Sequence, residues 1–297
     1  MKSDEHDLLT ARNWPHREAS LFVESGPLRW HLQRMGSGPC LLLLHGTGAS
    51  THSWSGLVEH LVGSFEVIAI DLPGHGFTQL ADNEGMSLPG MAALLSQLLR
   101  DLEVTVDVAA GHSAGAALLA RMCLDLSIAP AAVISINGAM LPLPGLARKL
   151  YPGAARLLAA LPGVPKLVAR HGSQKPVIKQ LLRQTGSAVS KHYVDHYQTL
   201  VGSAAHVNGA IQMMANWNLD TLEQELPDLD PALYLLACKN DKAVPFAQAA
   251  RLKVQLPQAD LRVLPELGHL GHEEDPEQFA RLITDIARPH GLFDSQD

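Results

Sequence analysis

The stretch VDVAAGHSAGAA, residues 106–117, joins a short apolar run to a helix-forming run through the motif G-x-S-x-G. This order predicts a strand, a sharp turn and a helix, the structural setting of a serine nucleophile. A side chain at Gly111 or Gly115 would crowd the neighbouring strand and helix, so the two glycines allow Ser113 a strained turn. The Ser113 hydroxyl then projects above the sheet. The alternative interpretation is an ordinary tight turn.

The composition is that of one large α/β domain, with or without an insertion. The chain has 297 residues, 46% of them hydrophobic, and a formal net charge of −7, which argues against a nucleic-acid partner. Its polar start predicts no secretory signal, and no apolar stretch approaches the roughly 20 residues of a membrane span. Cys40, Cys123 and Cys238 lie singly in apolar segments. We therefore expect reduced cysteines in a cytoplasmic protein, without a metal or cofactor.

Strands and helices alternate along most of the chain. Residues 21–23 and 28–32 predict an antiparallel hairpin at a sheet edge. Apolar runs typical of buried parallel strands follow at residues 40–44, 66–70, 132–136, 232–236 and 261–264. Helical spacing of apolar residues is found at 86–102 and 276–287. The alternation predicts a mostly parallel, doubly wound sheet.

The alternation stops between residues 140 and 229. This segment is helical in pattern, contains several Pro and Gly residues, and has no convincing strand. We interpret it as an inserted helical cap, or lid. The α/β core is then formed by residues 1–139 and 230–297.

A catalytic base and acid are expected in the loops that follow the strands, because ligands bind at that edge of such sheets. His269 follows the last predicted strand and completes the chain order Ser, acid, His. His272 is the alternative base, although the acidic residues after it favour a polar loop or a helix entry.

The acid is predicted by elimination. Residues 127–194 contain no Asp or Glu, so the loop after residues 132–136 cannot supply it. Asp241 directly follows the next strand, whereas Asp228 and Asp230 precede that strand. A solvated turn aspartate is the alternative, but His269 downstream favours a catalytic role for Asp241.

Two backbone N–H groups are expected to form an oxyanion hole, those of Ala114 and Thr47. Gly46 and Gly48 let the backbone beside Thr47 approach closely, and His75 is expected to brace a turn. His45 and His112 are expected to be structural residues beside the pocket. For Met213, Met214 and Trp217, the alternative is that they only pack inside the cap. The predicted pocket comprises His45, Gly46, His112, Met213, Met214 and Trp217.

With these residues in place, the chain resembles the α/β-hydrolase superfamily over nearly its whole length. The motifs that carry the resemblance are HGTG at 45–48, DLPGHG at 71–76, GHSAG at 111–115, ND at 240–241 and GH at 268–269. More narrowly, the chain is similar to the magnesium-chelatase accessory hydrolases of bacteriochlorophyll biosynthesis, through RWH at 29–31, HGTGASTHSW at 45–54, LPGM at 88–91, GHSAGAA at 111–117 and MMANW at 213–217. The resemblance implies an intact triad and a role near magnesium insertion into protoporphyrin, with magnesium chelatase as a partner.

Three functions remain open. The first is a serine hydrolase in which Ser113 attacks an apolar ester or a tetrapyrrole ester, His269 transfers the proton and Asp241 orients the imidazole. The second is a non-catalytic porphyrin-binding or chaperone protein on the same scaffold. The third is a cofactor-free lyase or perhydrolase that uses the same triad.

The predicted cap has an unusual charge. Between Leu126 and Val194 it carries basic residues interleaved with leucines, and no acidic residue. This pattern is typical of helices that lie on anionic surfaces, although a solvated face is the alternative. We expect a cytoplasmic protein that associates weakly with anionic membrane. The basic residues are Arg148, Lys149, Arg156, Lys166, Arg170, Lys175, Lys179, Arg183 and Lys191.

Overall fold

Eight strands form one sheet in the computed structural model, which describes residues 13–142, 153, 156–161 and 163–293. The strands are β1 (Ser20–Ser25), β2 (Leu28–Gly36), β3 (Cys40–Leu44), β4 (Glu66–Ile70), β5 (Val108–His112), β6 (Ala132–Ile136), β7 (Ala232–Cys238) and β8 (Asp260–Leu264). Their order across the sheet is β1-β2-β4-β3-β5-β6-β7-β8. Only the pairs β1·β2 and β2·β4 are antiparallel. The predicted hairpin and the mostly parallel sheet are confirmed.

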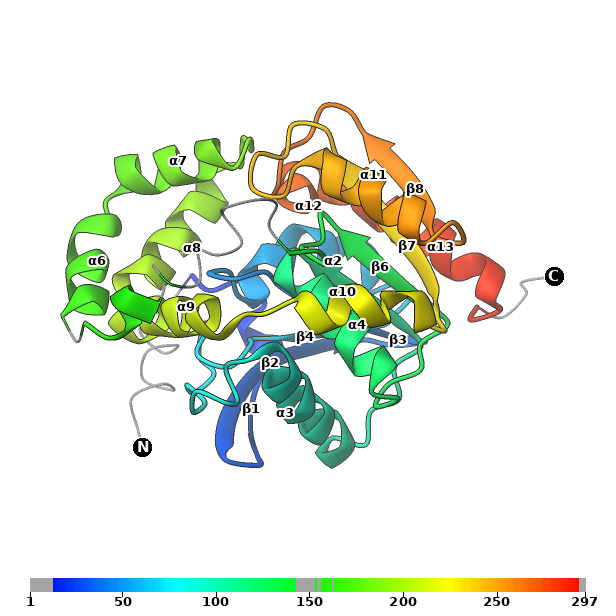
Figure 1. The fold of residues 1–297 in the computed structure, drawn as a ribbon, viewed down its shortest axis with the longest axis horizontal. Coiled ribbons are helices and arrows are strands. Elements are labelled where there is room, and N and C mark those ends of the chain that lie inside the picture. The colour runs from blue at the N-terminus through cyan, green and yellow to red at the C-terminus, as the bar shows by residue number, and fades with distance from the viewer. Residues whose placement is uncertain (1–12, 143–152, 154–155, 162, 294–297) are drawn as a thin grey trace.

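Helices cover both faces of this sheet (Figure 1). The α-helices are α2 (Ser55–Leu61), α3 (Leu88–Asp101), α4 (Ala114–Leu124), α6 (Val164–Gly172), α7 (Lys175–Gln184), α8 (Lys191–Gly202), α9 (Ala204–Asn216), α10 (Asp220–Glu225), α11 (Phe246–Gln255), α12 (Gly271–Glu274) and α13 (Pro276–Ala287). Short 3-10 helices are η1 (Arg17–Ala19), η2 (Thr51–Trp54), η3 (Leu226–Asp228) and η4 (Arg288–His290). Sequence capping is visible at α3, where the Ser87 side chain accepts a hydrogen bond from the Gly90 N–H and Pro89 lies in the first turn.

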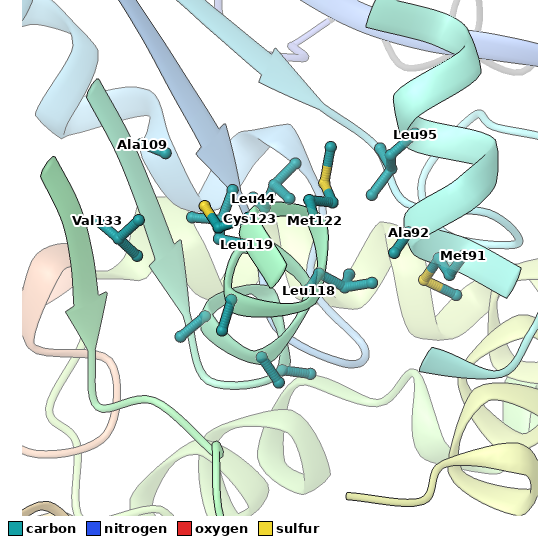
Figure 2. Packing of buried hydrophobic residues seen from close by; sticks show 14 of the residues in the cluster. Leu44, Met91, Ala92, Leu95, Ala109, Leu118, Leu119, Met122, Cys123 and Val133 are labelled. Atoms are coloured by element: carbon teal, nitrogen blue, oxygen red, sulfur yellow. The ribbon is translucent and has the colours of Figure 1, made fainter. Parts of the chain in front are cut away.

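The central strands are apolar on both faces because each face is covered. In β3, Leu42 and Leu44 belong to the core cluster that includes residues of α3 and α4, whereas Leu41 and Leu43 belong to the cluster of α2 and α13. All four are fully buried, at about 1.5–3 kcal/mol of hydrophobic stabilisation each. Figure 2 shows the first cluster, with Met91, Ala92 and Leu95 of α3 turned toward α4. These layers fix the strand ends that carry the candidate site.

Between β6 and β7 lie α6 to α10, followed by the short helix η3. Helices α6 to α9 gather at one side of the sheet, and α6 packs on α8 and α9 while α7 packs on α8 (Figure 1). Helix α10 lies over α4 instead. The cap limits at residues 140 and 229 stay a prediction, and Arg148 and Lys149 lie outside the described residues. No helix in the described ranges has the length and apolarity needed to cross a membrane.

Candidate active site

Ser113 lies between β5 and α4 in a strained backbone conformation. Its φ is 52° and its ψ is −115°, a region that non-glycine residues adopt at a cost of about 1–3 kcal/mol. Neighbouring backbone holds it there. The Ser113 N–H donates to the Ile136 carbonyl at 3.0 Å, and the Ser113 carbonyl accepts from the Ala139 N–H at 3.0 Å. The side chain is half-buried at the start of α4.

The two glycines of the motif permit this close approach. A Cβ on Gly111 would lie 2.5 Å from the Ala116 nitrogen, and a Cβ on Gly115 would lie 2.1 Å from the Leu44 carbonyl oxygen. Real Cβ atoms do not approach backbone atoms so closely, so α4 could not pack against β3 and β5 with larger residues. The prediction that side chains here would crowd the strand and helix is confirmed.

The predicted acid and base lie together. His269, in the loop after β8, has its Nδ1 2.7 Å from Asp241 Oδ2. The other oxygen of Asp241 accepts from the N–H groups of Ala243 and Val244, each at 2.8 Å. Both side chains are buried, at 6% and 8% exposure. With Asp241 ionised, the ring proton of His269 lies on Nδ1, and Nε2 is the nitrogen that can accept a proton.

The alternative base, His272, lies elsewhere. It belongs to α12, is fully buried, and has its Nε2 2.9 Å from Ser53 Oγ. Burial, with a smaller contribution from His269, lowers the pKa of His272 to about 3. Its ring packs on Trp54, with the ring centroids 4.7 Å apart. His272 is therefore a neutral packing residue that makes no hydrogen bond to Asp241.

Asn137 is a site residue that the sequence analysis missed. It follows β6 with a φ of 46°, and its buried side-chain amide joins this position to the loop after β8 and to the end of β7. The Nδ2 group donates to the carbonyls of Gly268, at 3.0 Å, and His269, at 2.9 Å. The Oδ1 atom accepts from the Cys238 N–H at 2.8 Å. Its position directly after a buried strand, at the same sheet edge as Asp241, was the signal available.

His112 acts on the same carbonyl. Its Nε2 donates to the His269 carbonyl at 3.0 Å, and the two rings lie 4.6 Å apart. Burial, His269 and His272 together lower the pKa of His112 well below 6.5, so the ring is neutral. His112 thus contacts the base loop from the residue next to Ser113. This arrangement fits the structural role expected for it.

The loop after β3 runs beside Ser113, the predicted nucleophile. A Cβ on Gly46 would lie 2.9 Å from both Ser113 Cβ and His112 Nδ1, so only glycine fits here. Thr47 is the next residue, and its side chain is exposed. The predicted oxyanion donors, the N–H groups of Thr47 and Ala114, thus belong to residues directly adjacent to Gly46 and Ser113. His45 is fully buried, and its Nε2 accepts from the Leu72 N–H at 3.0 Å, which ties this loop to the loop after β4.

The predicted cap residues occupy different environments. Met213 of α9 is fully buried, and its sulfur accepts a hydrogen bond from Thr47 Oγ1 at 3.4 Å. Trp217 is half-buried and packs against the core cluster of α3 and α4. Met214 is also half-buried. Met213 therefore directly contacts a predicted oxyanion-hole residue.

His206 of α9 fastens the cap to the same loops, and sequence analysis did not single it out. Its Nδ1 accepts from the Gly76 N–H at 3.0 Å, and its Nε2 donates to the Gly48 carbonyl at 3.1 Å. His75 has its Nδ1 3.0 Å from the Pro73 carbonyl, which matches the expected turn brace. Within the described ranges, no three His, Cys, Asp or Glu residues are grouped closely enough to hold a metal ion.

Comparisons with known proteins agree with this architecture. Residues 41–282 match the Alpha/beta hydrolase family. The chain is 38% identical over 275 residues to the Magnesium-chelatase 30 kDa subunit of Rhodobacter capsulatus, covering 92% of this chain and 96% of that protein. It is 26% identical over 260 residues to the Pimeloyl-[acyl-carrier protein] methyl ester esterase of Aeromonas hydrophila, covering 85% and 96% of the two chains.

A solved structure shows the same fold. An esterase from Exiguobacterium antarcticum superposes with a TM-score of 0.74 at 16% identity, covering 90% of this chain and 98% of that one. The resemblance expected from the motifs is confirmed, including homology to the Magnesium-chelatase 30 kDa subunit. Because the family match spans residues 41–282, well over half of the chain, the chain belongs to the alpha/beta hydrolase family.

Proposed function

We propose that the protein is a serine hydrolase that cleaves an ester or a thioester. The observation that carries this proposal is the 2.7 Å contact between His269 Nδ1 and Asp241 Oδ2. Ser113 is held in a strained turn, and its neighbour His112 hydrogen-bonds the His269 carbonyl. Such a turn presents the hydroxyl for attack, and the acid fixes the tautomer of the base.

The reaction has two halves. Ser113 Oγ attacks the substrate carbonyl carbon while its proton passes to His269 Nε2, and Asp241 stabilises the resulting imidazolium. The N–H groups of Ala114 and Thr47 stabilise the tetrahedral oxyanion. His269 then protonates the departing alcohol or thiol, which leaves an acyl group on Ser113. Water, deprotonated by His269, attacks the acyl carbonyl, the bond to Ser113 Oγ breaks, and His269 returns the proton to this oxygen, which releases the carboxylic acid and the free serine.

The biological role that we infer is that of an accessory factor in magnesium insertion for bacteriochlorophyll biosynthesis. The homologue named as a magnesium-chelatase subunit supports this role and makes magnesium chelatase a candidate partner. The relative and the structural neighbour that are named as esterases support the ester class. A tetrapyrrole ester combines both requirements.

A porphyrin-binding or chaperone role is the second candidate. The observation that favours it is that the homologue with 38% identity is named as a subunit of a chelatase, not as an enzyme of ester cleavage. In this case Ser113 would not turn over substrate. A lyase or perhydrolase reaction on the same three side chains is a third candidate.

The protein's proposed location is the cytoplasm, with weak attachment to anionic membrane through the outer cap. Leu157 and Leu167 are 65% and 60% exposed, and Lys166 and Arg170 are exposed on α6. Exposed aliphatic side chains beside cations are typical of a surface that contacts anionic lipid. Each basic residue near such a surface contributes about 1 kcal/mol, so the attachment is reversible.

Labelling with a fluorophosphonate distinguishes the two main candidates. A hydrolase should be labelled stoichiometrically at Ser113 under native conditions, and Asp241→Asn should slow the labelling. Absence of labelling in the folded protein, together with retained binding of protoporphyrin, would support the binding role instead.

A further inference from the structure

A cationic groove runs along α7, outside the candidate active site. Its volume is about 820 Å³, and it is lined by Lys175, Lys179, Arg183 and Lys242 with Gln180 and Gln184. The three basic residues of α7 are four positions apart, so they form one stripe on the helix. Lys242 enters from the loop that carries Asp241. The stripe extends over about 12 Å, since the helix rises about 1.5 Å per residue.

Most of this charge has no partner among the described residues. Lys175 pairs with Asp195 at 2.7 Å, and both side chains are nearly half exposed, so this pair contributes little. Within the described ranges, no carboxylate lies within 4.0 Å of the charged groups of Lys179, Arg183 or Lys242. A smaller hollow of about 250 Å³ adds Lys191 beside Lys179 and Arg183. The cations therefore stand together in a chain whose net charge is −7.

We infer that this groove binds an acidic segment of a partner protein. A segment with Asp or Glu at helical spacing could pair with cations repeated over two turns, whereas one phosphate or carboxylate could not span them. A lipid surface fits less well, because the site is concave and its lining has no exposed large aliphatic side chain. The exposed Val177 and Leu181 lie outside this lining, one turn from Gln180 and Gln184 at its glutamine edge.

The groove is connected to the candidate triad. Thr185 directly follows α7, and its carbonyl accepts from the Lys242 N–H at 3.0 Å and from the His269 N–H at 3.4 Å. Ser187 Oγ accepts from the Leu270 N–H at 2.8 Å. A Cβ on Gly186 would lie 1.9 Å from the Asn240 carbonyl oxygen, so the segment passes tightly against the acid loop. Docking on α7 should therefore alter the geometry of the loops that carry Asp241 and His269. An effect of docking on reactivity rests on the proposed function.

Fluorescence anisotropy of a labelled ten-residue oligo-glutamate peptide tests the docking on the full chain. Wild type should bind the peptide at 50 mM salt and lose most of the binding at 300 mM, because salt screens exposed charges. Lys179→Gln/Arg183→Gln should raise the dissociation constant about fivefold to tenfold. The matched control Lys166→Gln/Arg170→Gln removes the same charge from α6 and should change it by less than about twofold. Circular dichroism would verify that both variants fold.

Two results would overturn the docking site: no binding of the peptide by wild type, or equal losses in the two variants. Vesicles containing anionic lipid form a separate arm. If they bind through Lys179 and Arg183 while the peptide does not bind, the groove takes lipid headgroups and the inference is wrong.

The connection to the triad is measured by the rate of fluorophosphonate labelling of Ser113. Bound peptide should change this rate at least about twofold in wild type at saturation, and the groove variant should need about fivefold to tenfold more peptide for the same change. If Ser113 is labelled but the labelling rate does not change when peptide binds, the proposed connection between the groove and the triad is wrong. A protein that is never labelled would contradict the proposed function, and the anisotropy result would still decide the docking site.

Discussion

Ser113 shows how individual residues make a strained turn possible. Its positive φ is energetically unfavourable. The turn still forms because Gly111 and Gly115 have no side chain, and a Cβ on either glycine would collide with the backbone of α4 or β3. Hydrogen bonds of the Ser113 backbone hold this turn, so the turn does not depend on the hydroxyl. Removal of the hydroxyl should therefore change chemistry without changing the fold.

Ser113→Ala should reduce kcat on a small activated ester by up to about 10⁶, with an unchanged melting temperature. Asp241→Asn should lower kcat by about 10⁴, because His269 would then hold its proton on the wrong nitrogen.

His272→Ala should lower stability through the lost Ser53 contact and leave kcat within a few-fold. Steady-state kinetics and thermal melts measure both effects. If Ser113→Ala keeps more than about a tenth of the activity, or His272→Ala loses as much as His269→Ala, the assignment is wrong.

Asn137 should act as a positioning residue. Asn137→Asp keeps the acceptor for Cys238 but places a carboxylate against the Gly268 and His269 carbonyl oxygens that the amide now donates to. Displacement of the base by about 1 Å can cost about 100-fold in rate, so kcat should fall about tenfold to 100-fold with little change in KM. The pH profile of kcat should also shift, which a purely structural residue would not cause. An unchanged profile with an unchanged kcat would refute the role.

At the scale of elements, a buried polar cluster joins the cap helix α8 to the core. Glu273 of α12 accepts a hydrogen bond from Tyr197 of α8 at 2.7 Å and one from Ser53 of η2. Burial, only partly opposed by these two hydrogen bonds, raises the pKa of Glu273 from 4.5 to about 8. The carboxyl group is therefore neutral at pH 7. It joins α8 and η2 without a buried charge.

The stability of this contact should depend on pH. The folded chain holds the Glu273 proton more tightly than the unfolded chain, so the stabilisation is complete below pH 4.5 and decreases as pH rises toward 8. His272, with a pKa of about 3, and Tyr193, with a pKa of about 12, face the cluster and do not titrate in that window. Tyr197 has its pKa raised well above 10, so it does not titrate there either.

Glu273→Gln should remove this pH dependence. The difference in unfolding free energy between wild type and Glu273→Gln should shift by about 1 kcal/mol or more between pH 5 and pH 8.5, measured by urea unfolding. Glu277→Gln on the exposed side of α13 is the matched control and should leave the curve of wild type unchanged. Parallel curves for wild type and Glu273→Gln would contradict the raised pKa.

At the scale of the whole molecule, the sequence predicted those features that depend on residues close together in the chain, such as strands. The strand predictions at residues 66–70 and 132–136 coincide with β4 and β6, because a strand buried on both faces is a continuous apolar run. Asp241 and His269 could be paired in advance because parallel strands end at one edge. Asn137, His206 and Glu273 escaped prediction, since their partners lie far away in sequence and a single polar residue has no periodicity.

The many buried histidines should make the whole protein sensitive to acid. Burial lowers the pKa of each member of this set, so the folded chain keeps the rings neutral while the unfolded chain binds protons near pH 6.5. Their stabilising contribution is present above pH 6.5 and is lost as pH falls, at up to about 1.4 kcal/mol per pH unit for each ring. The set comprises His45, His52, His75, His112, His196, His206 and His272.

Urea unfolding at pH 7.5, 6.5 and 5.5 should therefore show a steep loss of stability below pH 6.5, which can consume much of a typical 5–15 kcal/mol. His206→Gln should reduce the slope of unfolding free energy against pH by the contribution of one titrating ring, because burial holds the pKa of His206 at about 4. His60→Gln replaces an exposed ring on α2 and should keep the slope of wild type. Equal stability of wild type at pH 7.5 and pH 5.5 would mean that the histidine rings are charged inside the fold, and the neutral network around His45, His75 and His206 would have to be abandoned.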